Sequence, residues 1–548
     1  MENLFDFKLL SSAETDTDDE NKQKYKFDVV RFDGHEHISE LYNFNILLAV
    51  HNVDDVQKLV NKLLKDRSVL VLHETMGNDR NICGVCDSVS IVAERQERLF
   101  IRVRLVPAIS VLSHDARSRV FLNKSIPAII NEVLQEETRK YGAIVYKMQL
   151  IDSDSYPTEE IVSQFNESNW DFVNRLMEKI GLYYYFEQPQ GVIDQEATLF
   201  ESLVIVDNLM FEKFLMFKDF SVNHESIDDV RCIHDFVLNY HKGCATSIQK
   251  GYDWDTSRTQ KVKPTAKFEA LFSDSSNEVF NGVSNTVIEH FDAALLSANA
   301  SLYANVDAQR NISLSETCTG TSANQTLASG CLFTVLGNRY IQEKNWFIVS
   351  LDHEGVQASY IVAGLGFESD QDKSFYQNKL LGIPRDVQYR SPLKTKIPKF
   401  YGVLVATVEG AEGSTIAYLD DLGRYKIKLP YDDSQKSSGQ SSCWVKLMAP
   451  YGGCDSTTGF HFPLLKDAQV LVGFIEGNID KPYIAGTIQD KSGSIVTSDN
   501  SYCNMIRTPA GNLMVMGDMP SDDYFYLIKN GYGYRTLGTP PDEILNKY

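Results

Sequence analysis

The chain has 548 residues, 43% of them hydrophobic, and its 53 Lys and Arg against 74 Asp and Glu give a formal net charge of −21. This length predicts about three or four domains, each large enough for an ordinary core. Because so negative a field repels phosphate, the charge argues against a nucleic-acid partner and against binding to anionic membranes.

Targeting signals and cysteine usage bear on where the protein works. Residues 1–10 lack a basic start and a long apolar core, residues 11–24 are polar and acidic, and no stretch predicts a membrane span. The nine cysteines are scattered, as a reducing cytoplasm permits, rather than arranged as a disulfide framework. We expect a cytoplasmic, globular protein that another machine must export if it leaves the cell.

The segment from 25 to 112 predicts strands around one helix. A turn is expected at Asp33-Gly34. Runs of β-branched and aromatic residues predict strands at 27–32, 44–50, 68–73, 82–93 and 99–106. A helix is expected after the second strand, with Asp54 and Asp55 at its N-terminus and an apolar face made of Val56, Leu59, Val60, Leu63 and Leu64.

Two short motifs in this segment have the residue types of ligand sets. Cys83 and Cys86 have the spacing of zinc and redox pairs, but no second pair stands at zinc spacing, so we interpret them as strand residues. His35 and His37 flank Glu36, but the spacing is not His-Glu-x-x-His and a third ligand is missing. A solvated turn is therefore the favoured interpretation of the histidines.

Two further amphipathic helices follow. The first begins at Ser125 and tolerates Pro127 in its first turn. The second begins at the capping-box sequence Ser168–Asp171 and ends at Gly181, before a strand at 182–186. The three tyrosines of that strand must point to alternate faces, which favours burial on both sides over a ligand-stacking platform.

The pattern weakens between 200 and 260. A helix is expected from about Glu289 to Arg310 because of its Ala and Leu content, and 266–286 is expected to be a loop. Prolines between 377 and 399 predict a linker, because proline cannot donate to the ladder of a central strand. Strands are expected at 233–240, 311–316, 331–336, 346–352 and 359–364.

The stretch from Tyr401 to Asp490 predicts a small β-barrel. Five or six short strands in about ninety residues suit a partly open Greek-key barrel of the OB type. Its seven basic and eleven acidic residues argue against the basic groove that a nucleic-acid-binding barrel needs. The strands are expected at 402–408, 416–419, 425–429, 443–448, 469–476 and 483–488.

One strand of this barrel breaks the alternation of apolar and polar residues. Both faces of Val470–Ile475 are apolar, whereas a solitary barrel should have a wet outer face. Something therefore packs on the outside of this strand, which favours an oligomer.

Many of these stretches resemble the valine-glycine-repeat (VgrG) spike proteins of type VI secretion systems, which are similar to the hub and needle of contractile phage tails. Asn504–Asp518 resembles only the opening of the family's triple-stranded β-helix needle, and no period follows in 521–548. Mild departures from the family occur at 467–469 and at Asn478. The other matching stretches are Phe32–Phe44, Val106–Leu112, Asn166–Phe186, Gly251–Asp255, Pro384–Pro392, Asp421–Asp432, Cys443–Leu447 and Gly459–Pro482.

The resemblance implies a mainly β fold with inserted helices (α+β), comprising two barrel-like hub domains, an OB-type barrel and the start of a β-helix needle. We expect the following division: 1–24, an acidic polar segment; 25–120, the first hub barrel; 121–376, a helical insertion and the second hub barrel; 377–399, a linker; 400–490, the OB-type barrel; and 491–548, the needle base and C-terminal tail.

The resemblance also implies a mechanical function. A homotrimer would nucleate a tube of Hcp-like rings, contact baseplate proteins, carry a PAAR-like tip protein and effector cargo, and meet the target membrane only by puncture. It would be cytoplasmic before firing and then secreted or delivered into target cells without a signal peptide. The alternative is the hub-spike of a phage tail or of an extracellular contractile injection particle.

Enzymatic activity and an OB-fold nucleic-acid binder are the less favoured hypotheses. The chain has no Gly-x-Ser-x-Gly, no His-Glu-x-x-His and no Gly-rich phosphate loop, and 490–504 has no room for a muramidase domain such as some phage relatives carry. Among 74 carboxylates, pairs arise by chance. We therefore predict that the chain is not an enzyme and has no catalytic, cofactor-binding or metal-binding residues.

Overall fold

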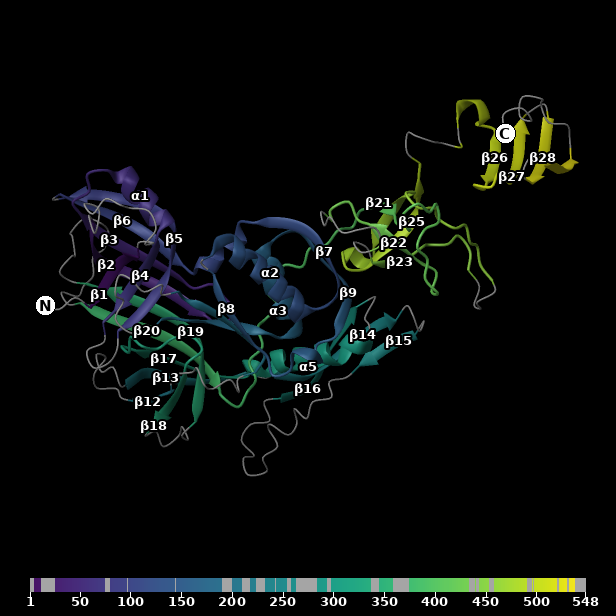
Figure 1. Ribbon diagram of the computed structural model, residues 1–548. Coiled ribbons are helices and arrows are strands. Elements are labelled where there is room, and N and C mark those ends of the chain that lie inside the picture. The colour runs from purple at the N-terminus through teal and green to yellow at the C-terminus, as the bar shows by residue number, and fades with distance from the viewer. Residues whose placement is uncertain are drawn as a thin grey trace.

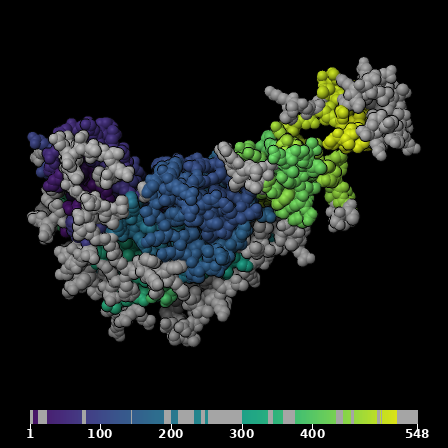
Figure 2. Space-filling model, viewed as in Figure 1, coloured from purple at the N-terminus to yellow at the C-terminus, as the bar shows by residue number. Residues whose placement is uncertain are grey.

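The fold is known from a computed structural model, in which strands predominate (Figure 1). Two sets of hub strands lie beside a helical layer, and a small barrel and a C-terminal sheet extend away from them, so the molecule is elongated (Figure 2). The structure describes residues 4–10, 25–73, 79–95, 97–142, 144–189, 200–208, 217–222, 232–241, 243–253, 258–262, 283–292, 297–336, 344–357, 374–432, 439, 443–452, 458–489, 495, 497–519, 522–529 and 532–537.

The first ring is a closed antiparallel barrel in the order β1-β4-β5-β6-β3-β2. It is closed by the pairing of β1 with β2. Apolar side chains of alternate positions fill it, as the period of a strand requires. Its strands are β1 (Phe5–Leu10), β2 (Lys26–His37), β3 (Asn43–His51), β4 (Arg67–Leu72), β5 (Arg80–Arg95) and β6 (Arg98–Val106).

Two features of the first ring differ from the sequence-based expectation. The N-terminal stretch, expected to be a polar segment, forms β1, because Phe5 and Phe7 are buried in the ring. Asp33-Gly34 is not a turn but lies inside β2. A Cβ at Gly34 would lie 2.1 Å from Cδ1 of Phe44, so this glycine makes room for the ring of the neighbouring strand.

Helix α1 (Val56–Lys65) is confirmed, with a narrower apolar face than expected. Asp55 caps it by accepting a hydrogen bond from Lys58 N at 3.1 Å. Leu59 and Leu63 are buried in the core of the first ring, whereas Val56 and Leu64 are 37% and 45% exposed.

The second ring closes in the order β19-β18-β12-β13-β17-β20 and joins the first through β2–β19 pairing. Residues 377–384, expected in the linker, belong instead to β20, which pairs with both β17 and β19. Pro384 is tolerated because it is the last residue of the strand. The strands of the second ring are β12 (Phe217–Val222), β13 (Cys232–Tyr240), β17 (Glu316–Ser322), β18 (Leu332–Leu336), β19 (Asn345–Val356) and β20 (Phe375–Pro384).

The helical layer confirms two predicted helices and corrects a third. Ser168 Oγ accepts from Asp171 N at 3.0 Å at the start of α3, and Gly181 ends this helix with φ 78°. Helix α5 starts later than expected, because the strand β16 occupies 283–292. The three helices are α2 (Ile126–Tyr141), α3 (Asn169–Ile180) and α5 (Ser297–Ser313).

Short sheets accompany these helices. In β10 (Tyr183–Glu187), Tyr183 and Tyr185 pack into one cluster and Tyr184 into another, which confirms that the tyrosines are buried on both faces. The expected strand at 359–364 lies outside the described residues. The remaining strands are β7 (Ala116–Ser125), β8 (Val145–Gln149), β9 (Thr158–Ser168), β11 (Ser202–Val206), β14 (Gly243–Asp253), β15 (Arg258–Val262) and β16 (Val283–Asp292).

The predicted small barrel is present, with strand order β23-β22-β21-β24-β25. A bridge between Leu447 and Ile484 brings its first and last strands together. The stretch 416–419 contributes isolated bridges rather than a strand. The strands are β21 (Leu404–Val408), β22 (Arg424–Lys428), β23 (Trp444–Lys446), β24 (Gln469–Phe474) and β25 (Pro482–Ile488).

The C-terminal region of the single chain is an antiparallel meander in the order β26-β27-β28-β29. Leu513 and Val515 are buried against Met505 and its neighbours. The strands are β26 (Cys503–Arg507), β27 (Leu513–Met519), β28 (Asp522–Lys529) and β29 (Tyr532–Leu537).

Candidate assembly surface and its connection to the hub

The outside of the OB-type barrel is apolar where a solitary barrel would be polar. In β24, Val470 and Val472 are buried in the barrel core. Leu471 alternates to the other face and pairs with Val405, whose side chain is 43% exposed. The structure therefore places the second apolar face of this strand on the barrel exterior.

Exposed apolar side chains concentrate in this part of the chain. Of the large hydrophobic side chains that are exposed in the described structure, nearly half lie between 401 and 488. Exposed apolar surface of this extent is typical of a protein–protein interface. The set is Tyr401, Val403, Val405, Ile416, Leu419, Leu422, Met448, Tyr451, Phe460, Phe462, Leu465 and Ile488.

The barrel is fastened to the hub by the two-stranded ribbon of β7 and β9. Val120 of β7 and Ile161 of β9 are buried in one cluster with the barrel core. Phe165 lies edge-on to Phe400 and Tyr431, with ring centroids 5.7 and 5.1 Å apart. The barrel therefore shares its core with a hub element that is distant in sequence.

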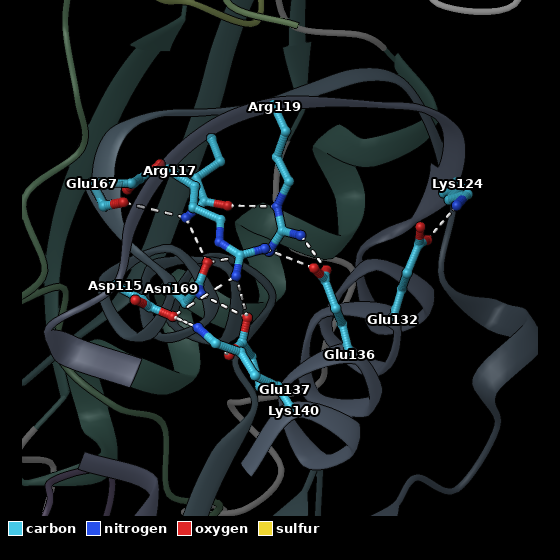
Figure 3. Close-up of polar contacts among 11 residues, drawn as sticks. Asp115, Arg117, Arg119, Lys124, Glu132, Glu136, Glu137, Lys140, Glu167 and Asn169 are labelled. Carbon is cyan, nitrogen blue, oxygen red and sulfur yellow. Dashed lines mark hydrogen bonds and ion pairs between the residues drawn. The ribbon is translucent and has the colours of Figure 1, made fainter. Parts of the chain in front are cut away.

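The opposite side of the ribbon is tied to helix α2 by ion pairs (Figure 3). Arg117 and Arg119 of β7 converge on Glu136, at 2.6 and 2.5 Å. Arg119 also donates to Asn169 at the start of α3 at 3.2 Å, and Asn169 donates to the buried Glu137 at 3.0 Å. These contacts hold the ribbon against both helices.

A second connection is the strap at 385–399, which leads from β20 to the barrel. The buried Glu178 carboxylate of α3 accepts from Lys394 N at 3.2 Å and from Thr395 N at 3.1 Å. Burial raises the pKa of Glu178. Arg390 donates to the carbonyl oxygens of Gly181 and Asp207 at 2.6 and 2.7 Å. The strap is thus bound to the hub at several points.

The joint between the two rings contains buried charge. Arg80 of β5 is paired with Glu36 of β2 and donates to the carbonyl of Leu327. Burial alone would raise the pKa of Glu36, but the Arg80 charge lowers it to about 2. The neighbouring His353 is fully buried and bonded to Tyr376 Oη at 2.7 Å, and burial lowers its pKa. The interior of the joint therefore holds a buried ion pair with a buried histidine beside it.

The motif residues of the sequence lie in these strands. Cys83 and Cys86 lie on the strand β5, as the sequence predicts. Cys83 packs with Val69 and Val71, whereas Cys86 packs in the first-ring core, so the two thiols belong to separate clusters. Burial raises their pKa values to about 12 and about 11. No group of three or more His, Cys, Asp or Glu in the described residues is arranged to hold a metal ion.

His35 and His37 lie on β2 and not in a turn, which corrects the sequence-based interpretation. Their rings stack 6.1 Å apart. The ion pair with Glu40 and a 2.6 Å hydrogen bond to Asp352 raise the pKa of His35 to about 9. Because His35 on β2 lies opposite Asp352 on β19, their contact links the two rings across the joint. We call this pair the clamp.

No local pattern marks the polar residues that connect the hub to the strap and to the barrel, such as Glu178 and Asp480. The hydrogen bonds by which they make these connections join residues more than 200 positions apart along the chain. Phe165, an isolated aromatic residue between polar neighbours, was the single local hint of a contact. No helix in the described residues is long and apolar enough to cross a membrane.

Comparison with known proteins identifies two matching families. Residues 35–359 match the phage tail baseplate hub (GPD) model, and residues 414–488 match the type VI secretion system/phage-baseplate injector OB domain. The spike protein VgrG4b of Pseudomonas aeruginosa is 24% identical over 477 residues, covering 85% of this chain and 55% of that protein. The actin cross-linking toxin VgrG1 of Vibrio cholerae is 25% identical, covering 81% of this chain and 38% of the toxin.

Solved structures share the fold. The Escherichia coli c3393 protein, a type VI secretion component described as similar to the T4 tail proteins gp27 and gp5, superposes with a TM-score of 0.58 at 19% identity, covering 88% of this chain and 99% of that one. A chain of the Francisella PdpA–VgrG complex gives a TM-score of 0.60 at 12% identity, covering 98% and 88%.

The chain spans about half the length of two Pseudomonas relatives, 55% of VgrG4b and 56% of VgrG5. The hub match and the barrel match follow one another in the order of the structural units, with residues 360–413 between them. Since the hub model matches more than half of the residues of this chain, the chain belongs to the phage tail baseplate hub (GPD) family.

Proposed function

We propose that the chain is a structural spike and hub at the tip of a contractile type VI secretion apparatus. The observation that carries this proposal is the presence, in one chain, of a double-ring hub followed by an injector-type OB barrel. The resemblance to VgrG spike proteins over 85% of the chain supports the same assignment. Deleting the gene in its own host should abolish contraction-dependent secretion; secretion that continues unchanged would contradict the proposal.

The assembled form is a homotrimer. The apolar exterior of the barrel, including Val405 and the face of β24 that carries Leu471, supports this, because exposed apolar surface is removed from water when copies associate. Native mass spectrometry of the full chain at micromolar concentration should give three times the 61.9 kDa chain mass. A stable monomer under these conditions would contradict the trimer.

The partners of the trimer are a tube of Hcp-like rings, baseplate proteins, a PAAR-like tip protein and effector cargo. The protein is cytoplasmic before firing and is delivered into target cells by the apparatus. Co-purification from a host that carries a tagged copy, followed by mass spectrometry, tests each partner separately.

The chain acts mechanically and not as an enzyme. Several relatives are named as spike proteins and one as an actin cross-linking toxin, but this chain covers only 38% of the toxin. Purified protein should release no product from peptidoglycan, lipid, nucleic acid or actin. Activity that is lost on one carboxylate or His substitution would overturn this.

We assign these roles to the domains proposed from the sequence, with the hub extended to include β1 and β20. The hub is then 5–384, the strap 385–399, the OB-type barrel 400–490, and the needle base begins at 491. Deleting 521–548 should lower trimer stability or tip recruitment while the hub folds normally. The alternative function, the hub-spike of a phage tail or extracellular particle, would be favoured if the protein purified with a contractile particle released by lysis.

A further inference from the structure

The ribbon of β7 and β9 has an edge that the barrel completes. The two strands form a sheet of their own in the described structure, so the outer edge of β9 has no neighbouring strand there. Unpaired backbone groups at a buried edge must find other partners. In the middle of this edge is Ser163, which is fully buried.

Both backbone groups of Ser163 are bonded to side chains from two different parts of the molecule. Its N–H donates to Oδ1 of Asp480, in the loop between β24 and β25 of the barrel, at 2.6 Å. Its carbonyl oxygen accepts from Nη2 of Arg175, on helix α3 of the hub, at 2.8 Å. One residue of β9 therefore connects the barrel to the hub through its two backbone polar groups.

Each of the two side chains is itself held in place. Arg175 is bound by both carboxylate oxygens of Glu167, at 2.7 and 2.8 Å, in the bidentate geometry that fixes a guanidinium group. Asp480 N donates to Oδ1 of Asn478 at 3.0 Å, which shapes the loop that presents the Asp480 carboxylate. The polar connection is thus preorganised on both sides.

Apolar contacts surround this polar connection. Phe165, two residues further along β9, contacts the rings of both Phe400 and Tyr431 of the barrel edge-on. Ile161, two residues before Ser163, is buried in the barrel cluster. At the rim, Glu160 pairs with Arg424 at 3.3 Å. The same short stretch of β9 thus meets the barrel through apolar packing, a partly buried hydrogen bond and an ion pair.

We propose that the β7–β9 ribbon, which we call the bracket, fixes the direction of the OB barrel relative to the hub. Its polar contact is the hydrogen-bonded series Asp480–Ser163–Arg175, and its apolar contact is made by Phe165. The strap at 385–399 is bound to the hub. It meets the barrel at the C-terminal end of the strap, where Phe400 N donates to Gly477 O. A force passed from the hub to the barrel along the strap alone would act through one covalent connection. The bracket supplies a second, non-covalent contact and so resists bending. This role does not depend on which contractile particle contains the protein.

The test uses the full chain in the assembly in which it purifies. In Asp480→Ala, the amide of Ser163 loses its acceptor, so hydrogen exchange of the peptide that covers 160–166 should accelerate at least tenfold. Exchange in β24 and in α3 should stay unchanged, because the barrel and the hub each keep their cores. Asp480→Asn, which retains an oxygen acceptor at this position, should preserve most of the protection.

Phe165→Ala tests the apolar part of the bracket. Exchange of the same peptide should accelerate, and small-angle scattering should show a broader distribution of distances between hub and barrel. The matched control is Glu132→Gln, which breaks the exposed ion pair with Lys124 on the ribbon without touching the barrel. It should change neither readout.

Two outcomes would overturn the proposal. If neither Asp480→Ala nor Phe165→Ala alters exchange at 160–166 or the scattering curve, the ribbon does not hold the barrel. If Asp480→Ala instead accelerates exchange in β24 as much as in β9, Asp480 serves the fold of the barrel and not its docking.

Discussion

The joint between the two rings buries charged groups, whereas the exterior of the OB barrel exposes apolar ones. At the joint, charged and titratable groups are taken out of water and bonded within one chain: Glu36 accepts from Arg80 and from Ser329 N, and His353 Nδ1 is bonded to Tyr376 Oη. On the barrel, apolar groups such as Tyr401 and Val405 remain 76% and 43% exposed.

The contrast indicates which contacts each region needs. A buried ion pair depends on both partners, so the joint is complete in the single chain and sensitive to loss of either charge. An exposed apolar surface gains stability only when another surface covers it. We therefore expect substitutions at the joint to change folding, and substitutions on the barrel exterior to change assembly.

The largest effect is expected from Arg80→Ala. It leaves Glu36 buried without its partner, so the free energy of unfolding should fall by about 3–5 kcal/mol, measured by denaturant titration of the full chain. Arg104, paired with Asp87 at 3.4 Å and 51% exposed, is the control. Arg104→Ala should cost less than about 1 kcal/mol. An equal loss in the two variants would remove the distinction between joint and surface.

The double variant Glu36→Gln with Arg80→Met sharpens the same point. It removes both charges and puts the amide oxygen of Gln in place of the Glu36 carboxylate oxygen that accepts from Ser329 N at 3.2 Å. Its loss of stability should be clearly smaller than that of Arg80→Ala, because no uncompensated charge remains. A double variant as unstable as Arg80→Ala would show that packing, and not charge, dominates at the joint.

Val405→Glu tests the barrel exterior. A charge placed in a covered interface should weaken association about tenfold or more, which is about 1.4 kcal/mol, while the melting temperature of the barrel changes little. Sedimentation or native mass spectrometry over a concentration series measures the shift. Leu64→Glu, at a 45% exposed position of α1, is the matched control and should leave the mass unchanged.

Cys83 and Cys86 should behave as inert core residues. Because burial raises their pKa values to about 12 and about 11, the thiolate fraction at neutral pH is negligible, and maleimide should label them only after denaturation. Replacing both with Ala should cost about 1 kcal/mol each and leave metal content unchanged. Stoichiometric zinc in the native protein that disappears in the variant would contradict the strand interpretation.

The smallest effect concerns His35. Its pKa is raised to about 9 in the folded protein, so its contribution is fully present below the unfolded value of 6.5 and is lost as pH rises through about 9. At an exposed pair this amounts to at most about 1 kcal/mol and weakens with salt. The melting temperatures of wild type and His35→Gln should therefore differ at pH 6 and converge by pH 10. A difference that does not change with pH would rule out the clamp.

The sequence by itself determined the elements whose signals are local. The capped helix α3, the alternating tyrosines of β10 and the short strands of the barrel follow from periodicity and turn chemistry over a few residues. The second apolar face of β24 was also visible, because strand alternation is a property of adjacent residues. These features required no knowledge of distant parts of the chain.

Only the tertiary structure decided how these elements close and connect. Ring closure by β1, the packing of Phe44 over Gly34 and the two partners of β20 are contacts between strands that local pattern does not specify. The bond from Ser163 to Asp480 spans 317 positions of sequence. The physical reason is that a polar side chain carries no local mark of the partner that will satisfy it, so its role is fixed only when folding brings that partner within hydrogen-bonding distance.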